Sequence, residues 1–307
     1  KRILVILLAL TLVIGLSACE TTDTADNATD QQNEKEGQAS VDGQNEKVIL
    51  VVSFGTSYND SRAVTIEAIE ADIAAAYPDW EVRRAFTAQT IIDKLAERDG
   101  LQIDNVAEAM DRLVADGVKE VVVQPTHVMP GYEYDDVVEE VKNYADQFDF
   151  FAIGEPLLYT EADYEKVIDA VLSDIPEVGS EDTAVVFMGH GTEHYANATY
   201  AKLQQRGWGA GYENYFIGTV GAEPSLEDVI ELVKESGASK VVLLPFMIVA
   251  GDHANNDMAG DEADSWKSAF EAAGFEVECK IQGLGQNEGV RAVEVEHLQT
   301  AITDAGL

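Results

Sequence analysis

Residues 183–194, TAVVFMGHGTEH, are an apolar run that ends in a Gly-His-Gly turn, and residues 47–58, KVILVVSFGTSY, repeat this arrangement. Apolar runs of this length without alternating polar residues are typical of strands buried on both faces. When the two segments are superposed, Ser53-Phe54-Gly55-Thr56 falls on Gly189-His190-Gly191-Thr192. The two segments therefore predict the same strand followed by the same glycine-containing turn.

A second pair of segments matches in the same order along the chain. Residues 119–133, KEVVVQPTHVMPGYE, lie on residues 239–253, SKVVLLPFMIVAGDH, when Pro125 is placed on Pro245. Gly131 then falls on Gly251, and Glu133 falls on His253. Two matches in one order indicate an internal duplication. Chance similarity between apolar strands is the alternative explanation.

The segments between these strands have helical and strand patterns in alternation. Apolar residues recur at helical spacing in residues 60–77, and this helix is expected to end before Pro78. Residues 81–87, EVRRAFT, resemble another strand, and helices are expected at 88–100 and 105–117. Strands that alternate with helices are typical of parallel sheets with helices on both faces.

We therefore expect an α/β fold with two similar lobes, residues 48–178 and 179–307. Each lobe should be a mostly parallel sheet flanked by helices, with a ligand cleft between the lobes. Ligands of open α/β sheets bind outside the carboxyl ends of the strands. The turns expected to face this cleft are residues 53–57, 127–133, 189–194 and 251–253.

The N-terminal part of the chain has the pattern of an exported lipoprotein. Lys1-Arg2 is followed by an apolar run that is short for a membrane-spanning helix, and by Leu16-Ser17-Ala18-Cys19. This predicts a signal peptide at residues 1–19 with Cys19 as the lipidated residue; a plain signal peptide with a chance cysteine is the alternative. Residues 20–47 carry almost no large apolar side chain, which predicts a disordered tether. The expected location is extracytoplasmic, at the cell surface or in the periplasm.

Cysteine content and charge limit the partners. With Cys19 lipidated, Cys279 has no partner, so no disulfide framework is expected.

The chain has 57 acidic and 20 basic residues and a net charge of −37. Such a surface repels phosphate backbones, which excludes nucleic acid as an expected partner. It attracts cations, although a solvated acidic surface is the ordinary explanation.

Histidines at strand ends are the strongest candidates for chemistry. His190 follows an apolar run between two glycines, which suits a metal ligand or a general base; the alternative is a turn histidine bonded to the backbone. His253, in a loop rich in Asp and Asn, is expected on the cleft wall opposite His190. His194 should begin the next helix as a cap or as a substrate contact. Residues 190–194 also match the H-x-x-E-H order of inverted zinc peptidases, but Gly191 prevents both histidines from sharing one helical face.

The remaining candidates stay open between a structural and a functional role. His127 lies near a strand end and is either packed or functional, and His297 has the pattern of an ordinary helical residue. Glu133 and Glu223 lie in strand-end turns. A carboxylate buried beside histidines can move protons or bind a cation, and the alternative for each is a solvated turn residue.

Several longer stretches resemble the anaerobic sirohydrochlorin cobaltochelatases, the class II tetrapyrrole chelatases. The resemblance runs from about Val48 to Ile302. It implies two similar α/β lobes with the tetrapyrrole between them, and insertion of Co²⁺ into sirohydrochlorin without a nucleotide; Fe²⁺ and Ni²⁺ stay open as substrate metals. The stretches that carry it are ILVVSFGTSYNDS, RAFTAQTIIDKL, VVFMGHGTEHYA, LLPFMIVAGDHANNDMAGDEADSWK and GLGQNEGVRAVEVEHL.

The resemblance also implies roles for individual residues. The family's two metal-binding histidines fall on His190 and His253, and His190 is the expected proton acceptor. The family's third ligand, a glutamate, falls on Gly221 in an ungapped placement, and Glu223 could replace it if the turn is remodelled. The residues expected to bind the tetrapyrrole are Phe54, Gly55, Thr56, Ser57, Glu133 and His194.

A second hypothesis stays open beside the enzyme. The chain could be a non-catalytic lipoprotein that captures haem, another tetrapyrrole or a metal for a transporter. Gly221 in place of glutamate favours this hypothesis, whereas His190 and His253 together favour the chelatase. The membrane is a further expected partner, through the lipid anchor, and a homo-oligomer of the chain stays open.

Overall fold

A computed structural model describes residues 46–307 of the chain. The predicted signal peptide, the lipidation site Cys19 and residues 20–45 of the predicted tether lie outside the described residues. The described residues belong to one compact unit. Of the helices among these residues, none combines the length and the apolar character needed to cross a membrane.

Two four-stranded parallel sheets form the framework and have the same strand order. Val52 pairs with Pro125 in sheet 1, and Met188 pairs with Pro245 in sheet 2, so the register is also repeated. The expectation of two similar α/β halves is thereby confirmed. Sheet 1 has the order β2 (Glu81–Phe86), β1 (Lys47–Ser53), β3 (Glu120–Pro125) and β4 (Phe150–Ile153). Sheet 2 has the order β6 (Tyr215–Thr219), β5 (Thr183–Gly189), β7 (Lys240–Pro245) and β8 (Glu276–Cys279).

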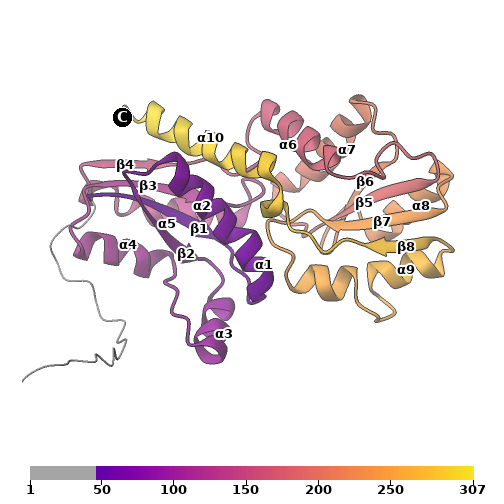
Figure 1. Cartoon of the computed structure of the whole chain (residues 1–307), viewed down its shortest axis with the longest axis horizontal. Helices are drawn as coiled ribbons and strands as arrows, with labels where there is room; N and C mark the ends of the chain where they lie inside the picture. The colour runs from indigo at the N-terminus through magenta and orange to yellow at the C-terminus, as the bar shows by residue number, and fades with distance from the viewer. Residues whose placement is uncertain (1–45) are drawn as a thin grey trace, which may run out of the picture. The chain divides into compact units, whose positions relative to one another are not determined.

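Helices connect the strands in both halves, as Figure 1 shows. The first half of the chain contains α1 (Asn59–Val64), α2 (Ile66–Ala76), α3 (Gln89–Asp99), α4 (Val106–Ala115), α5 (Tyr132–Lys142) and α6 (Glu161–Ser173), and α6 packs on α7 and α10. The second half of the chain contains α7 (Ala198–Gly209), α8 (Leu226–Ser236), α9 (Trp266–Ala272) and α10 (Glu288–Asp304), and these helices alternate with the strands of sheet 2 along the sequence. Short 3₁₀ turns lie at Ala145–Gln147, Tyr195–Asn197 and Leu284–Gln286, and a π-helical turn, η3, lies at Ala254–Met258.

The apolar strands are buried on both faces, as their sequence predicts. One continuous apolar cluster reaches from Ile49 and Val51 of β1 to Val185 and Phe187 of β5. Helices α6 and α10 contribute to this cluster and pack against each other. Helix α10 follows sheet 2 along the chain but packs on α2 and β3 of the first half (Figure 1). The two sheets therefore share a core, although the predicted boundary after residue 178 separates their strands.

The helix predicted over residues 60–77 is interrupted at one residue. Thr65 leaves the helical conformation, with φ −120° and ψ −80°, and separates α1 from α2. Its hydroxyl donates to the carbonyl of Ser61 at 2.5 Å, and Gly285 packs against its side chain. The helical periodicity continues through this break, so the sequence pattern alone did not reveal it.

Candidate functional site

A cavity of about 480 Å³ lies at the carboxyl ends of β1, β3, β5 and β7. Residues of segments 53–58, 126–133, 190–192 and 246–253 line its wall, and α3 adds Thr90, Ile91 and Lys94. The expectation that these four turns face one cleft is confirmed. Both halves of the chain contribute to the wall, so the cavity lies where the two halves meet.

His190 and His253 lie next to each other in this cavity. Their ring centroids are 4.9 Å apart, with the ring planes at 78°. His190 follows β5 and His253 follows the β7 turn, and these strands are neighbours in sheet 2. The two histidines therefore belong to one wall of the cavity, and the expectation that they lie on opposite walls is wrong.

Each of the two imidazoles is oriented through its Nδ1 atom. His190 Nδ1 lies 2.8 Å from the carbonyl oxygen of Gly191, which can only accept, so Nδ1 carries the proton. His253 Nδ1 lies 2.5 Å from Oδ2 of Asp257, one helical turn further along the chain. In neutral imidazoles these bonds leave the lone pair on Nε2 of both rings. Carboxylate or carbonyl partners of this kind orient metal-binding histidines.

The π-helical turn η3 places Asp257 beside His253. The sequence indicated a loop here, but Ala254 and Met258 are fully buried in the apolar cluster of sheet 2. Asn255 Nδ2 donates to the carbonyl of Gly251 at 2.7 Å and fixes the start of the turn. Asp257 was not among the predicted site residues, although its spacing of four residues from His253 was the available signal.

Glycines shape the turn that holds His190. Gly191 has φ +80°, and a Cβ atom there would lie 2.8 Å from Cβ of Thr219. Gly221 N donates to the carbonyl oxygen of His190 at 3.0 Å. Position 221 therefore lies against the His190 turn, and because it is a glycine it contributes no side chain that could act as a ligand.

Glu223 is not brought to the two histidines. It is exposed and outside the cavity wall, and its Oε2 accepts from the backbone N–H of Ser225 at 3.1 Å. A hydrogen bond with Asp228 and the charge of that group raise the pKa of the Glu223 carboxyl. The peptide chain turns back into α8 after Pro224, which directs Glu223 to the helix start. Within residues 46–307, no group of three or more His, Cys, Asp or Glu residues has an arrangement that could hold a metal.

The other residues predicted to bind the tetrapyrrole divide into two groups. Phe54, Gly55, Thr56, Ser57 and Glu133 all line the cavity. Phe54 is 50% exposed and offers a flat apolar surface. Gly55 has φ +98°, and a Cβ atom there would lie 2.5 Å from the Phe86 ring, so the turn requires glycine.

His194 lies outside the cavity wall and has a structural position. Its Nδ1 accepts from Ala196 N at 3.2 Å and so caps the turn before α7. Its Nε2 lies 3.4 Å from Oδ2 of Asp135, and its ring packs edge-on against Tyr132. The predicted capping role is confirmed, whereas its position does not support contact with a ligand in the cavity.

His127 lines the cavity as a neutral, unpartnered imidazole. Both ring nitrogens are inaccessible to solvent and have no hydrogen-bond partner within the described part of the chain. Burial lowers the pKa of His127 to about 4, and the charge of Glu133 opposes this shift. The side chain is thus uncharged at neutral pH and adds no charge to its wall.

His297 belongs to helix α10, as its pattern predicts, and its side chain is buried. Its Nδ1 lies 3.2 Å from the carbonyl oxygen of Glu155, and its Nε2 lies 3.2 Å from Oδ1 of Asp163. These contacts join α10 to α6 and to the loop after β4. His297 therefore stabilises the shared core and lies away from the cavity wall.

The rest of the cavity wall is mostly apolar, with few charges. Lys94, Glu133 and Asp252 are its charged residues among those described. The Tyr58 hydroxyl donates to Oδ1 of Asp252 at 3.2 Å and joins the β1 turn to the β7 turn. Cavities of this kind suit an organic ligand that is held by a small number of polar groups. The apolar wall residues include Ile66, Ile91, Val128, Met129, Phe246 and Ile248.

Comparison with known proteins gives matches over nearly the whole described region. A family model described as cobalt chelatase (CbiK) matches residues 47–303. The sirohydrochlorin cobaltochelatase of Salmonella typhimurium is 41% identical over 259 residues, which are 84% of this chain and 97% of that protein. The sirohydrochlorin cobaltochelatase CbiKC of Nitratidesulfovibrio vulgaris is 32% identical over 262 residues, covering 84% of this chain and 91% of that protein.

The fold is also similar to that of a solved structure. SirB from Bacillus subtilis with Fe³⁺ superposes with a TM-score of 0.61 at 14% identity, covering 85% of this chain and 97% of that chain. At this identity the likeness concerns the fold, and it agrees with the paired parallel sheets described above.

Proposed function

The chain belongs to the cobalt chelatase (CbiK) family, and we propose that it is a sirohydrochlorin cobaltochelatase that inserts Co²⁺ without a nucleotide. The observation that supports this proposal best is the pair of adjacent imidazoles in the cavity between the sheets. His190 and His253 both have Nδ1 bound to an acceptor, which leaves both Nε2 atoms for a metal ion. The surrounding apolar wall, with Phe54 exposed on it, suits a flat tetrapyrrole.

The two histidines would receive the substrate metal. Imidazole nitrogen is a suitable ligand for Co²⁺, Fe²⁺ and Ni²⁺, so geometry and supply must select among these ions. Asp257 holds the ring of His253 in place and makes its Nε2 a better ligand. Because position 221 has no side chain, an ion on the two histidines keeps coordination positions for water and for the incoming ring nitrogens. A metal ion that must pass from the protein to the tetrapyrrole needs coordination positions that the ring nitrogens can occupy.

His190 is also the proposed proton acceptor. Metal insertion releases two protons from the pyrrole nitrogens as the metal–nitrogen bonds form. Since Nδ1 of His190 is bound to the Gly191 carbonyl, Nε2 is the one ring atom that can bind either the metal or a proton. His190 therefore accepts a proton only after the metal has moved to the tetrapyrrole. Its exposed ring can then return the proton to solvent. Glu133, also on the cavity wall, is available for the second proton.

A direct assay tests this function. Purified protein is mixed with sirohydrochlorin and Co²⁺, and the absorbance change of metal insertion is followed against a protein-free control. We expect His190→Ala and His253→Ala each to lower the rate by about 100-fold or more, as for loss of a general base or metal ligand. Both variants should keep the wild-type melting temperature, because neither side chain is buried. If wild-type protein binds the ring but inserts cobalt no faster than the control, the chelatase proposal fails. That result would instead favour the non-catalytic tetrapyrrole-binding function.

We also propose that the protein acts outside the cytoplasm on a lipid anchor. The basic start, the apolar run and the Leu16–Cys19 sequence support this location. Cells that express the full chain should incorporate labelled palmitate into it, and Cys19→Ser should abolish the label and release the protein from membranes. Wild-type protein without label, or a variant that stays membrane-bound, would contradict the anchor.

A further inference from the structure

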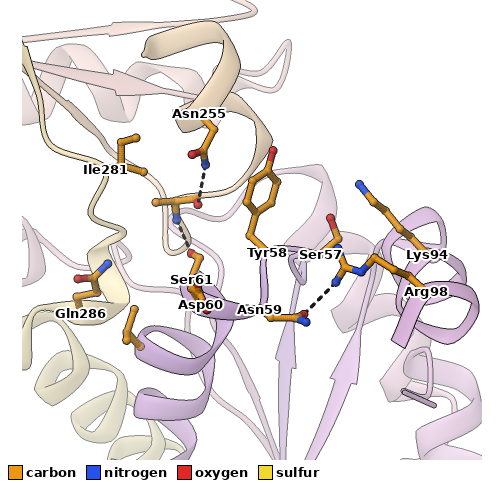
Figure 2. A pocket seen from close by; sticks show the side chains of 12 residues that line it. Ser57, Tyr58, Asn59, Asp60, Ser61, Lys94, Arg98, Asn255, Ile281 and Gln286 are labelled. Atoms are coloured by element: carbon orange, nitrogen blue, oxygen red, sulfur yellow. Dashed lines mark hydrogen bonds between the residues drawn. The ribbon is translucent and has the colours of Figure 1, made fainter. Parts of the chain in front are cut away.

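A second chamber opens next to the metal-binding cavity. It has a volume of about 690 Å³ and shares Ser57, Tyr58 and Lys94 with that cavity. The two spaces therefore adjoin each other at these residues. Figure 2 shows Tyr58 and Ser57 from the β1 turn beside Lys94 and Arg98 from α3, with Gln286 across the chamber.

Lys94 is the unpaired cation at the junction of the two spaces. It is exposed, and no carboxylate of the described residues lies within ion-pair distance of its Nζ atom, whereas Arg98, one turn further along α3, is bound to Asp99 and to Asn59. Among residues 46–307, Lys94 is also the one cation on the wall of the metal-binding cavity. Its ammonium group is therefore free to pair with an anion.

Uncharged donors extend this anion-binding surface. The Ser57 hydroxyl and the Gln286 amide line the chamber, and neither makes a hydrogen bond with a described residue. By contrast, the Asn255 amide is occupied by the carbonyl of Gly251. Asp60 is the opposing charge in this chamber, and it directs an anion toward the side of Lys94.

We propose that this chamber binds side-chain carboxylates of the tetrapyrrole and that Lys94 pairs with one of them. The inference rests on the proposed function, because sirohydrochlorin carries acetate and propionate groups around its rim. With its face at His190 and His253, the ring would direct these groups outward, and the chamber adjoins the cavity at Ser57, Tyr58 and Lys94. Lys94 thus determines which tetrapyrroles bind and how the ring is oriented over the metal.

The test is the binding of sirohydrochlorin in the absence of cobalt. We expect Lys94→Gln to weaken binding about three- to tenfold, as for loss of one solvent-accessible charge pair. Lys94→Arg should bind as the wild type does. Lys234→Gln is the matched control, since Lys234 is exposed on α8, outside both spaces, and forms no ion pair with the described residues. The difference between wild type and Lys94→Gln should shrink in high salt. In turnover, Lys94→Gln should raise KM more than it lowers kcat.

The outcomes separate this inference from the proposed function. If Lys94→Gln binds sirohydrochlorin as tightly as the wild type does, or if Lys234→Gln weakens binding equally, the chamber has no specific role and the inference is overturned. If the wild type inserts no cobalt but Lys94→Gln still binds the ring more weakly, the chelatase proposal fails and the carboxylate site stands.

Discussion

Glu294 on α10 is a fully buried carboxylate in the shared core. One of its oxygens accepts from Gln124 Nε2 at 3.0 Å, whereas Oε1 has no hydrogen-bond partner in the described region. Burial raises the pKa of Glu294 well above its usual range, and the charge of Asp163 adds to the shift. A raised pKa means that the folded protein keeps a proton that the unfolded chain releases, so stability falls as pH rises above the usual glutamate value.

We therefore expect Glu294→Gln to stabilise the protein at neutral pH. The amide has the same shape, keeps an acceptor for Gln124 and cannot ionise, so the free energy of unfolding at pH 7 should rise by about 1 kcal/mol. Denaturant unfolding at pH 4 and pH 7 measures it, and the gain should be larger at pH 7. Glu296→Gln, on the exposed side of the same helix and paired with Lys166, should change stability by less than about 0.5 kcal/mol. A variant less stable than wild type at pH 7 would show that the carboxylate is needed in the core.

At the scale of helices and strands, the local sequence pattern predicted the elements whose structure depends on neighbouring residues in the sequence. Buried parallel strands are continuous apolar runs, so β1, β3, β5 and β7 and the turns after them were predictable, and so was the cavity at their ends. The break at Thr65 lies against Gly285, which is distant in sequence, and the π-helical turn buries Ala254 and Met258 in the apolar cluster of sheet 2. Long-range packing of this kind leaves no periodic signal.

The residues of the site divide in the same way, into those that local sequence pattern predicted and those that depend on the folded structure. His190 and His253 were predicted from their strand-end positions, but the pairing with Gly191 and Asp257 that fixes their tautomers depends on turn geometry. Glu223 was a candidate to replace the family glutamate at the metal because it is close to position 221 in sequence. The turn after β6 directs its side chain to the start of α8 instead.

At the scale of the whole molecule, the described residues join two copies of one α/β plan through a single core. Because α10 leaves sheet 2 and packs on α2 and β3, the cavity walls from both halves are held by one continuous apolar cluster. The imidazoles of His190 and His253 belong to the wall of sheet 2, whereas Lys94 and Glu133 belong to the wall of sheet 1. A ring between them would meet the metal on one side and charged groups on the other.

The position of the substrate metal is the most direct test of this arrangement. Crystals of the protein grown with Co²⁺ are measured at the cobalt absorption edge, and the anomalous density locates the ion. We expect one strong peak about 2.1 Å from Nε2 of both His190 and His253, the distance usual for imidazole and a divalent metal, and we expect His253→Ala to lose it. A peak at the acidic surface away from both rings, or a peak unchanged in the variant, would contradict the proposed site.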